Sequence, residues 1–263
     1  MNERSAVIRL VIGILALNLF AATLSAQSAP YQRLLIPIVP SDNLPGAFGS
    51  MWRGELTLFN ASDDPVNVYL QVCPPIVNEC IPRAELAAHR SIKPGVFPTA
   101  ASQGAFLDIA TADLAKVTIK FRVRDLSRQS QTWGTEIPLG PIAEFRHLVR
   151  LIEVPSDSRF RVRLRVYSAA GAATYVHLRA YKTDAISPIS ESEVALDGIR
   201  GQPPGYPSSS PAYAELEPIP PALPDADGTL RLEIEQRIAG EPPIWAFVSV
   251  TNNETQHVTL ITP

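Results

Sequence analysis

The sequence is poor in the residues that usually form metal and catalytic centres. Its 263 residues include only two cysteines and four histidines. The histidines show no ligand-like spacing, and they stand at four scattered positions: His89, His147, His177 and His257. The G-x-S-x-G elbow of many serine hydrolases is also missing. We therefore expect no metal and no cofactor. Enzymatic activity stays as the less favoured alternative, because residues distant in sequence can still meet in a fold.

The chain also lacks a strong charge of either sign. Its formal net charge is −3 at pH 7, so the composition gives no general attraction to nucleic acid or to acidic membranes. Hydrophobic residues make up 46% of the chain and charged residues 19%, which is typical of a globular rather than a disordered protein. A chain of this length has room for two ordinary domains.

The only long apolar run lies at the N-terminus, where residues 1–26 have the layout of a secretory signal peptide. Arg4 and Arg9 precede the apolar stretch of residues 10–24, which ends in the small residues Ser25 and Ala26. Position 27 is glutamine rather than the cysteine of a lipoprotein box. We expect cleavage after Ala26, no lipid anchor, no integral membrane segment in the remaining chain, and a secreted, periplasmic or cell-surface location. A retained N-terminal anchor is the alternative.

The two cysteines are close in sequence. Cys73 and Cys80 enclose a six-residue, turn-forming segment that begins with two prolines. In an oxidising compartment a disulfide is the usual state of two such cysteines. A metal site would need further ligands, and only His89 lies near in sequence. We therefore predict a structural disulfide between Cys73 and Cys80.

The chain contains an internal repeat. Residues 50–70 return without a gap as residues 158–178, an offset of 108 (158 − 50), with six identical positions. Each copy reads as a strand, a polar turn and a second strand, so two similar hairpins are expected. A second, weaker repeat aligns residues 123–138 with 248–263, an offset of 125 (263 − 138). A spacing near 110 residues is about the size of one β-sandwich.

The predicted fold is all-β, with two tandem immunoglobulin-like antiparallel β-sandwiches after the signal peptide. The first spans residues 27–138 and the second residues 139–263. Residues 52–59 and 160–167 alternate between apolar and polar side chains, as half-buried strands do. The connection Leu139–Gly140–Pro141 is short and contains proline, so we expect a restricted angle between the sandwiches, packed end to end.

Residues 198–224 do not fit a sandwich pattern. They contain eight prolines in 27 positions, so we interpret them as a long proline-rich loop. The loop is either a poorly ordered insertion or a docking segment that uses Tyr206 and Tyr213. A final hairpin over residues 244–263 is expected to turn at Asn252 and Asn253, which tolerate a positive φ.

Parts of the mature sequence resemble a known group of proteins. The segments that show the resemblance are Ile36-Pro37, Gly49-Ser50-x-Trp52, Leu56-x-Leu58-Phe59-Asn60 and the ending of residues 245–256. They are similar to secreted bacterial proteins of unknown function that are built of immunoglobulin-like sandwiches. The resemblance implies the fold and export, and it brings no catalytic residues. The chain departs from the usual opening at Arg53-Gly54, which does not disturb the implied fold.

The densest basic feature is a stripe of alternating arginines: Arg159, Arg161, Arg163 and Arg165. One interpretation is a site for a polyanion such as a polysaccharide or a lipid headgroup. The favoured interpretation is a solvated sheet face with cross-strand partners, for which Glu233 and Glu235 are the candidates if the second and fifth strands are neighbours. No aromatic residue shares the strand face of these arginines, so a base-stacking surface for nucleic acid is not expected.

Three smaller motifs are interpreted as turns. Asp225-Ala226-Asp227-Gly228 has half of a calcium loop but lacks its later ligands. Asn60-Ala61-Ser62 and Asn253-Glu254-Thr255 match the N-glycosylation pattern. Turn formation is the simpler role for the residues of all three motifs in an exported bacterial-type protein.

The sequence alone therefore predicts a secreted, non-enzymatic structural or adhesive module that binds a protein or glycan partner. A carbohydrate-active accessory or hydrolytic protein is the first alternative, and exposed aromatics or paired carboxylates would favour it. A chaperone-like assembly subunit is the second, and an unpaired edge strand would favour it.

The predicted disulfide can be tested directly. The exported chain should react with a thiol-alkylating reagent only after reduction. Cys73→Ser should lower the free energy of unfolding in urea by about 2 kcal/mol, because the bridge no longer restricts the unfolded loop. The reduced wild type is the matched control and should show the same loss. Rapid alkylation of the unreduced folded protein would contradict the bridge.

Overall fold

The structure is a computed structural model, and it describes residues 31–38, 44–70, 83–94, 103–128, 133–182, 184–198, 210–217, 228–238 and 240–263. Within these ranges the chain consists of β-strands joined by turns and by short 3₁₀ segments, without an α-helix. The all-β prediction is confirmed. None of these residues belongs to a helix with the length and apolar character needed to cross a membrane. The predicted signal peptide lies outside the described residues.

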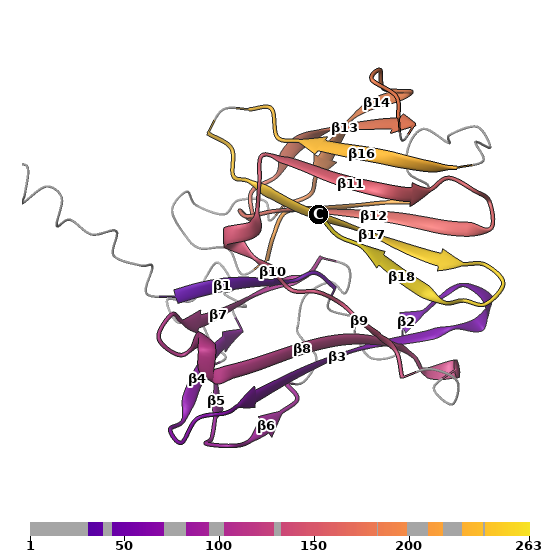
Figure 1. The fold of residues 1–263 in the computed structure, drawn as a ribbon. Coiled ribbons are helices and arrows are strands. Elements are labelled where there is room, and N and C mark those ends of the chain that lie inside the picture. Colours follow the sequence, from indigo (N-terminus) through magenta and orange to yellow (C-terminus); the bar gives the residue numbers. More distant parts are fainter. Residues whose placement is uncertain are drawn as a thin grey trace, which may run out of the picture.

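The first half of the chain forms two antiparallel sheets (Figure 1). Sheet A has the order β10-β1-β7-β4-β5 and is formed by β1 (Tyr31–Ile36), β4 (Val66–Leu70), β5 (Arg83–Leu86), β7 (Ala105–Ala110) and β10 (Gly140–Pro141). Sheet B has the order β2-β3-β8-β9 and is formed by β2 (Leu44–Pro45), β3 (Met51–Asn60), β8 (Val117–Asp125) and β9 (Thr135–Glu136), with β6 (Ser91–Ile92) also pairing β3.

The second half forms two more antiparallel sheets. Sheet C has the order β15-β12-β17-β18 and is formed by β12 (Phe160–Ser168), β15 (Tyr213–Leu216), β17 (Ile244–Asn252) and β18 (Val258–Ile261). Sheet D has the order β11-β16-β13-β14 and is formed by β11 (Leu148–Pro155), β13 (Thr174–Lys182), β14 (Ser190–Leu196) and β16 (Thr229–Glu235). Four 3₁₀ segments complete the described elements: η1 (Ala47–Gly49), η2 (Leu114–Lys116), η3 (Leu126–Arg128) and η4 (Ile142–Glu144).

The two halves have the same strand pairing. The order β1-β7-β4-β5 corresponds to β11-β16-β13-β14, and β6-β3-β8-β9 corresponds to β15-β12-β17-β18. Asn60 pairs with Val117, and Ser168 pairs with Ile244. The first offset is therefore 108 (168 − 60), as the sequence repeat indicates. The second is 127 (244 − 117) rather than 125, so the weaker sequence alignment was two residues out of register.

The predicted hairpins of the two repeats are wrong in their pairing. β3 lies in sheet B and β4 in sheet A, and likewise β12 lies in sheet C and β13 in sheet D. The polar turn after each first strand thus crosses between facing sheets. Asn60 and Ser168 end these strands at equivalent, fully buried positions, and each accepts a hydrogen bond from the backbone N–H two residues later. Two strands that pair in one sheet and two strands that lie in facing sheets show the same alternation of apolar and polar residues, because in both cases each strand turns its apolar side chains to the core. The sequence pattern therefore does not distinguish the two arrangements.

This crossing also separates the strand order from that of an immunoglobulin constant domain. There the first two strands are neighbours in one sheet. Here β1 and β3 lie in different sheets, as do β11 and β12.

The final hairpin is confirmed, since β17 pairs with β18. Its turn differs in detail from the prediction. The positive φ falls on Gln256 (φ 57°) rather than on either asparagine. The side chain of Asn252 instead accepts the N–H groups of Glu254 and Thr255, both at 2.9 Å. Asn252 therefore fixes the turn by capping it, as short amide side chains often do.

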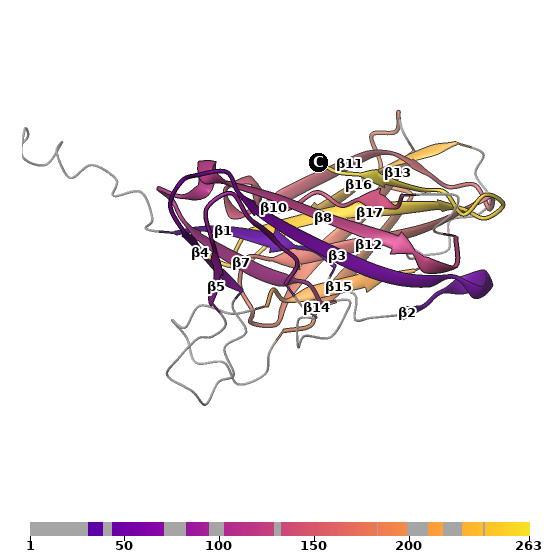
Figure 2. The same ribbon diagram turned by 90° about the horizontal axis from the view of Figure 1, so that it is seen from below.

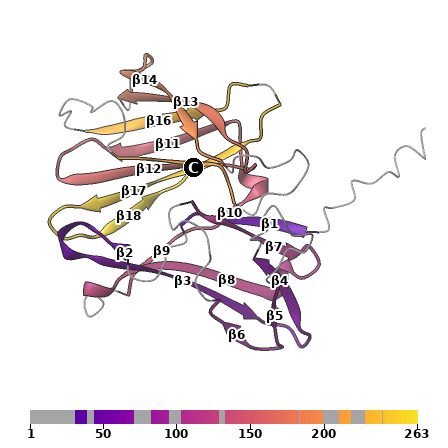
Figure 3. The ribbon, with the colours of Figure 1, turned by 180° about the vertical axis from the view of Figure 1, so that it is seen from behind.

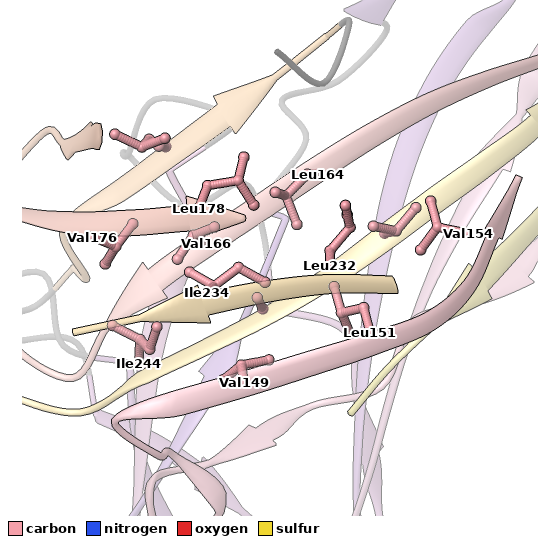
Figure 4. Close-up of a cluster of buried hydrophobic side chains, with 14 of the residues drawn as sticks. Val149, Leu151, Val154, Leu164, Val166, Val176, Leu178, Leu232, Ile234 and Ile244 are labelled. Atoms are coloured by element: carbon pink, nitrogen blue, oxygen red, sulfur yellow. The ribbon is translucent and has the colours of Figure 1, made fainter. Parts of the chain in front are cut away.

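Each pair of sheets encloses its own apolar cluster. Side chains of sheets A and B form one, and side chains of sheets C and D form the other. Figure 4 shows the second, in which Leu164 and Val166 of β12 face Leu178 of β13 and the residues Leu232 and Ile234 of β16. The inward direction predicted for the alternate residues of β12 is confirmed.

A third cluster joins the two halves. Leu35 and Phe106 come from the outer face of sheet A, and they pack with three aromatic residues on the outer face of sheet C: Tyr167, Trp245 and Phe247. Phe145 completes the cluster, which we call the interface cluster. Sheets A and C therefore meet through their faces, and the prediction of end-to-end packing is wrong. Figures 1 and 3 show β1 and β10 beside the second half, and Figure 2 gives the view from below.

The connection between the halves is part of the sheet rather than a tether. Gly140 and Pro141 form β10, which pairs with Leu35 and Leu34 of β1. A Cβ atom at Gly140 would lie only 3.2 Å from Cδ2 of Trp245 and 3.4 Å from Cβ of Leu35. The connection is short because its backbone lies directly against the interface cluster.

The proline-rich segment contains a strand that the sequence did not reveal. β15 occupies residues 213–216 and pairs with β12. Ser210, Ala212 and Ala214 are buried, and the ring of Tyr213 stacks on Tyr167 with centroids 6.4 Å apart. The prediction of one long loop over 198–224 is therefore wrong for residues 213–216. Tyr206 lies outside the described residues.

The interface cluster should dominate the stability of the whole chain. Trp245→Ala should lower the free energy of unfolding by about 3 to 5 kcal/mol, because it opens a large cavity between the halves. Tyr167→Phe should cost about 1 kcal/mol, because the Tyr167 hydroxyl donates to the buried Pro37 carbonyl. Urea unfolding followed by circular dichroism measures both.

Trp133→Ala is the matched control, since this tryptophan is exposed, and its unfolding should stay within about 0.5 kcal/mol of the wild type. A Trp245→Ala variant as stable as the wild type would contradict the role of the cluster.

Candidate functional site

The predicted arginine stripe lies on the outer face of sheet C. Arg161, Arg163 and Arg165 project from alternate positions of β12, opposite the residues that face the core. Arg159 precedes the strand and binds the carboxylate of Asp157 through its Nε and its backbone N–H. The structure therefore brings Arg161, Arg163 and Arg165 together in one row. Arg159 lies outside the row and stabilises the turn before the strand through Asp157.

Carboxylates of β15 neutralise most of this row. Glu215 accepts from Nε of Arg165 at 2.8 Å and lies 3.1 Å from Nη1 of Arg163. Glu217 contacts Arg163 and lies 3.6 Å from Nε of Arg161. Three arginines thus share two carboxylates in a ladder across two neighbouring strands, which is a stabilising arrangement for a sheet face.

The prediction that Glu233 and Glu235 pair with the arginine stripe is wrong, because β16 lies in sheet D rather than beside β12. Glu235 contacts Arg179, and Glu233 accepts from Nε of Arg150 at 3.0 Å. The favoured interpretation, a face with cross-strand partners, agrees with the geometry although the partners differ. The missed signal was the alternation Tyr213-Ala214-Glu215-Leu216-Glu217, which the surrounding prolines concealed.

The ladder runs from solvent into the interface between the halves. The side chain of Arg165 is only 9% exposed, and its Nη1 donates to Oγ of Ser249 at 3.3 Å. Its guanidinium lies 5.6 Å from the ring centre of Phe247, a member of the interface cluster. The inner end of the arginine row is therefore a structural contact, because its donors already have partners.

The described histidines do not converge. His89 lies 2.9 Å from Asp63, His177 lies 3.4 Å from Glu191, and His257 lines a shallow pocket. Over the described parts of the chain, no three histidine, cysteine, aspartate or glutamate residues gather closely enough to hold a metal ion. Cys73, Cys80 and Asp225 to Asp227 lie outside those parts.

The shallow pocket lies at the end of the second sandwich. It has a volume of about 470 Å³ and is lined by residues of β12, β17, β18 and the last turn: Phe160, Val250, Asn252, Thr255, His257 and Thr259. Its lining contains one titratable side chain and no carboxylate. A general acid or base would act there without a charged partner to orient it.

Asn60 is closed to modification in the folded chain. Its side chain is fully buried, and Nδ2 donates to the carbonyls of Asp64 at 2.7 Å and Leu86 at 3.0 Å. The turn interpretation of Asn60-Ala61-Ser62 therefore agrees with the structure, since a buried amide with two backbone partners cannot reach a modifying enzyme.

A second basic surface, which sequence reasoning missed, lies on the outer face of sheet B. The register places Arg53 opposite Arg124, Glu55 opposite Arg122 and Thr57 opposite Lys120. Trp133 lies over this face with 71% of its surface exposed. Its ring centre is 4.7 Å from Cζ of Arg122 and 5.0 Å from Cζ of Arg124. We call Trp133, Arg122 and Arg124 with their neighbours Arg53 and Lys120 the tryptophan platform.

Gly134 allows the tryptophan to lie against the arginines. Its φ is +98°, and a Cβ atom there would be 2.6 Å from Cγ of Arg124 and 2.7 Å from the Val123 carbonyl. Only glycine fits this approach without displacing its neighbours. The residue before it, Trp133, is thereby placed over both guanidinium groups, where cation–π attraction holds the ring.

Carboxylates neutralise only part of the positive charge of the tryptophan platform. Glu55 accepts from Nη1 of Arg124 at 3.0 Å, and Glu136 lies 3.7 Å from Nζ of Lys120. Within the described ranges, no carboxylate forms an ion pair with Arg122. Along β8 the platform has three cations, Lys120, Arg122 and Arg124, against the two carboxylates of Glu55 and Glu136, so its charge is positive on a protein whose total charge is negative.

The pKa of Glu233 is set by burial and by three nearby arginines. Burial alone would raise its pKa. The hydrogen bond and charge of Arg150, together with the charges of Arg231 and Arg179, outweigh burial and hold the pKa of Glu233 below its ordinary value. Arg231 lies 3.7 Å from the same oxygen that accepts from Arg150.

Comparison with known proteins adds no family to this description. No protein-family model, curated protein or solved structure matches the chain.

The pH dependence of stability should reveal the Glu233 contacts. A lowered folded-state pKa gives stability that is present above the ordinary carboxyl pKa of about 4.3 and is lost as the pH falls through the folded value. Glu233→Gln should therefore cost about 1 kcal/mol at pH 7 and no longer differ from the wild type near pH 3. Urea unfolding between pH 3 and pH 7 measures this difference.

Glu254→Gln is the matched control, because Glu254 is exposed, and it should follow the wild-type curve throughout. A Glu233→Gln variant with wild-type stability at pH 7 would show that the arginine contacts add nothing.

Proposed function

We propose that the chain is an exported, non-enzymatic structural or adhesive module that binds a protein or glycan partner at the cell surface or in the periplasm. The observation behind this proposal is the interface cluster, which fixes two sandwiches of equal topology as one body. A fixed pair of sandwiches presents broad sheet faces at a constant angle, which suits a surface that must hold a partner under load.

The charged and aromatic side chains that could bind a partner lie on these outer faces. The arginine–glutamate ladder covers sheet C, and the tryptophan platform covers sheet B. The cores between the sheets are apolar. Recognition over an exposed face fits this distribution better than a reaction inside a cleft. Export is supported by the sequence of residues 1–26 and by the close pair Cys73 and Cys80.

The strand edges support a surface module rather than a donor-strand assembly subunit. β14 is an edge strand, and Glu191 and Glu193 place charges along it. β11 is interrupted by a bulge between Leu151 and Val154, where Glu153 has a φ of 58°. Edge charges and bulges are devices that discourage pairing with another strand.

The alternative of a carbohydrate-active accessory protein has one specific observation in its favour, the exposed ring of Trp133. A flat aromatic side chain on a sheet face is a common platform for a sugar ring. Such a module would bind glycans without hydrolysing them, so both candidates predict ligand binding and differ in the ligand.

A binding screen tests the proposal. The mature chain, residues 27–263, would be immobilised and exposed to neutral and acidic polysaccharides, to whole cells and to surface protein extracts. Each bound glycan would then be incubated with the chain in solution, and its reducing ends measured. We expect saturable binding to a glycan or a purified protein, with no increase in reducing ends over time.

Chain unfolded by heat is the control and should bind nothing specifically. Catalytic release of reducing ends from any bound glycan would replace the proposal with the hydrolytic alternative. Absence of saturable binding across the whole screen would count against an adhesive role.

A further inference from the structure

We propose that the tryptophan platform on sheet B binds an acidic polysaccharide. Trp133 stacks on one of its sugar rings, and Arg122 binds one of its carboxylates. The inference rests on the proposed adhesive function and names its ligand class. No residue of the predicted arginine stripe takes part.

The indole ring of Trp133 contacts two arginines and is still open to solvent. Arg122 and Arg124 lie within 5.0 Å of its centre, and Gly134 holds the backbone close to them. The residue is nevertheless 71% exposed, so much of its surface meets solvent. The weakly polar C–H face of a pyranose is a good partner for such a ring. Because the arginines support the indole from beneath, little side-chain entropy is lost when a sugar stacks on it.

The Nε atoms of Arg122 and Arg124 are buried, so the donors that a ligand can reach are on the Nη atoms at the tips of the guanidinium groups. A guanidinium that lies flat against an aromatic ring points its N–H groups outward in its own plane, where they can bind a carboxylate through two parallel hydrogen bonds. Arg124 already donates to Glu55 at 3.0 Å. Arg122 has no ion pair with a carboxylate in the described ranges, so it is the residue with donors to offer.

The neighbouring charges favour a polymer over a single acidic sugar. Lys120 follows Arg122 along β8 on the same face, and Arg53 pairs with Arg124 across β3. The side chain of Lys120 is 61% exposed, and Glu136 lies at 3.7 Å. A row of cations along one strand matches the spaced negative charges of a polyuronate. The attraction is local, because the whole chain is negative.

The duplication gives an independent reason to regard this face as specialised. At the offset of 127, Lys120 corresponds to Phe247 and Arg122 to Ser249. In the second half this face is covered by the first half at Phe247 and neutralised by Glu215 at its arginines. In the first half the same face has an exposed tryptophan and an excess of cations. One copy became an interface, and the other stayed accessible.

A polysaccharide fits the platform better than a nucleic acid. Single-stranded nucleic acid is bound by several aromatic side chains that stack successive bases along a basic groove. The platform offers one aromatic ring.

The test is isothermal titration of the full mature chain with three probes: a galacturonate hexasaccharide, a neutral glucose hexasaccharide and a single-stranded DNA oligonucleotide. We expect binding of the galacturonate only, weakening as salt is added. Trp133→Ala and Arg122→Ala should each lower the affinity by about tenfold or more, whereas Trp133→Phe should retain most of it, because it keeps a ring.

Two matched controls accompany these variants. Arg163→Ala removes an arginine that is already paired with Glu215 and Glu217, and Tyr175→Ala removes an exposed aromatic residue from sheet D. Both should leave the affinity within about twofold of the wild type. Thermal unfolding of each variant separates loss of binding from loss of fold.

The outcomes separate this inference from the proposed function. Galacturonate binding that Trp133→Ala leaves unchanged, or stronger binding of the DNA, would overturn the tryptophan platform as an acidic-glycan site. If galacturonate fails while another glycan or protein binds saturably in the screen, the inference is wrong and the adhesive function stands. If nothing binds in either experiment, both are wrong.

Discussion

The buried contact of Tyr167, Trp245 and Phe247 with Leu35 and Phe106 is the interaction on which the rest of the structure depends. It turns the outer face of sheet C into a second core. It holds β10 against β1, where a Cβ atom at position 140 would press on the side chains of Trp245 and Leu35, and it gives Arg165 a dry environment at the inner end of the ladder. Burial raises the pKa of the Tyr167 hydroxyl, so that it stays a donor to Pro37 at any physiological pH.

The two halves show how one topology serves two purposes. Each has eight corresponding strands in the same pairing, and the equivalent strands β3 and β12 each end with a buried capping side chain, Asn60 or Ser168. Their cores are alike because strand alternation leaves little freedom there. Their outer faces differ because the cores do not constrain them: sheet C carries the aromatic residues of the interface cluster, and sheet B carries the cations of the tryptophan platform.

The sequence predicted the strands well where one face is buried and one is wet. Residues 52–59 and 160–167 alternate clearly, and the structure places β3 and β12 there. It could not assign strands to sheets, because Leu164 faces a core whether β13 is a neighbour or lies opposite. The apolar run Trp245-Ala246-Phe247 indicates that both faces of this strand are buried, but it does not show that sheet A is what covers the outer face. β15 was hidden by prolines, and the tryptophan platform required the register that brings Trp133 over Arg122.

The position of the interface cluster along the chain has a consequence for biosynthesis. Phe247 follows Phe106 by 141 residues (247 − 106). At ordinary rates of synthesis this distance takes on the order of ten seconds. For much of that interval Leu35 and Phe106 lack most of their cover, because Trp245 and Phe247 have not yet been made. The nascent protein is therefore most prone to stick to itself just before its last strands emerge, and a holding chaperone would find its substrate at that moment.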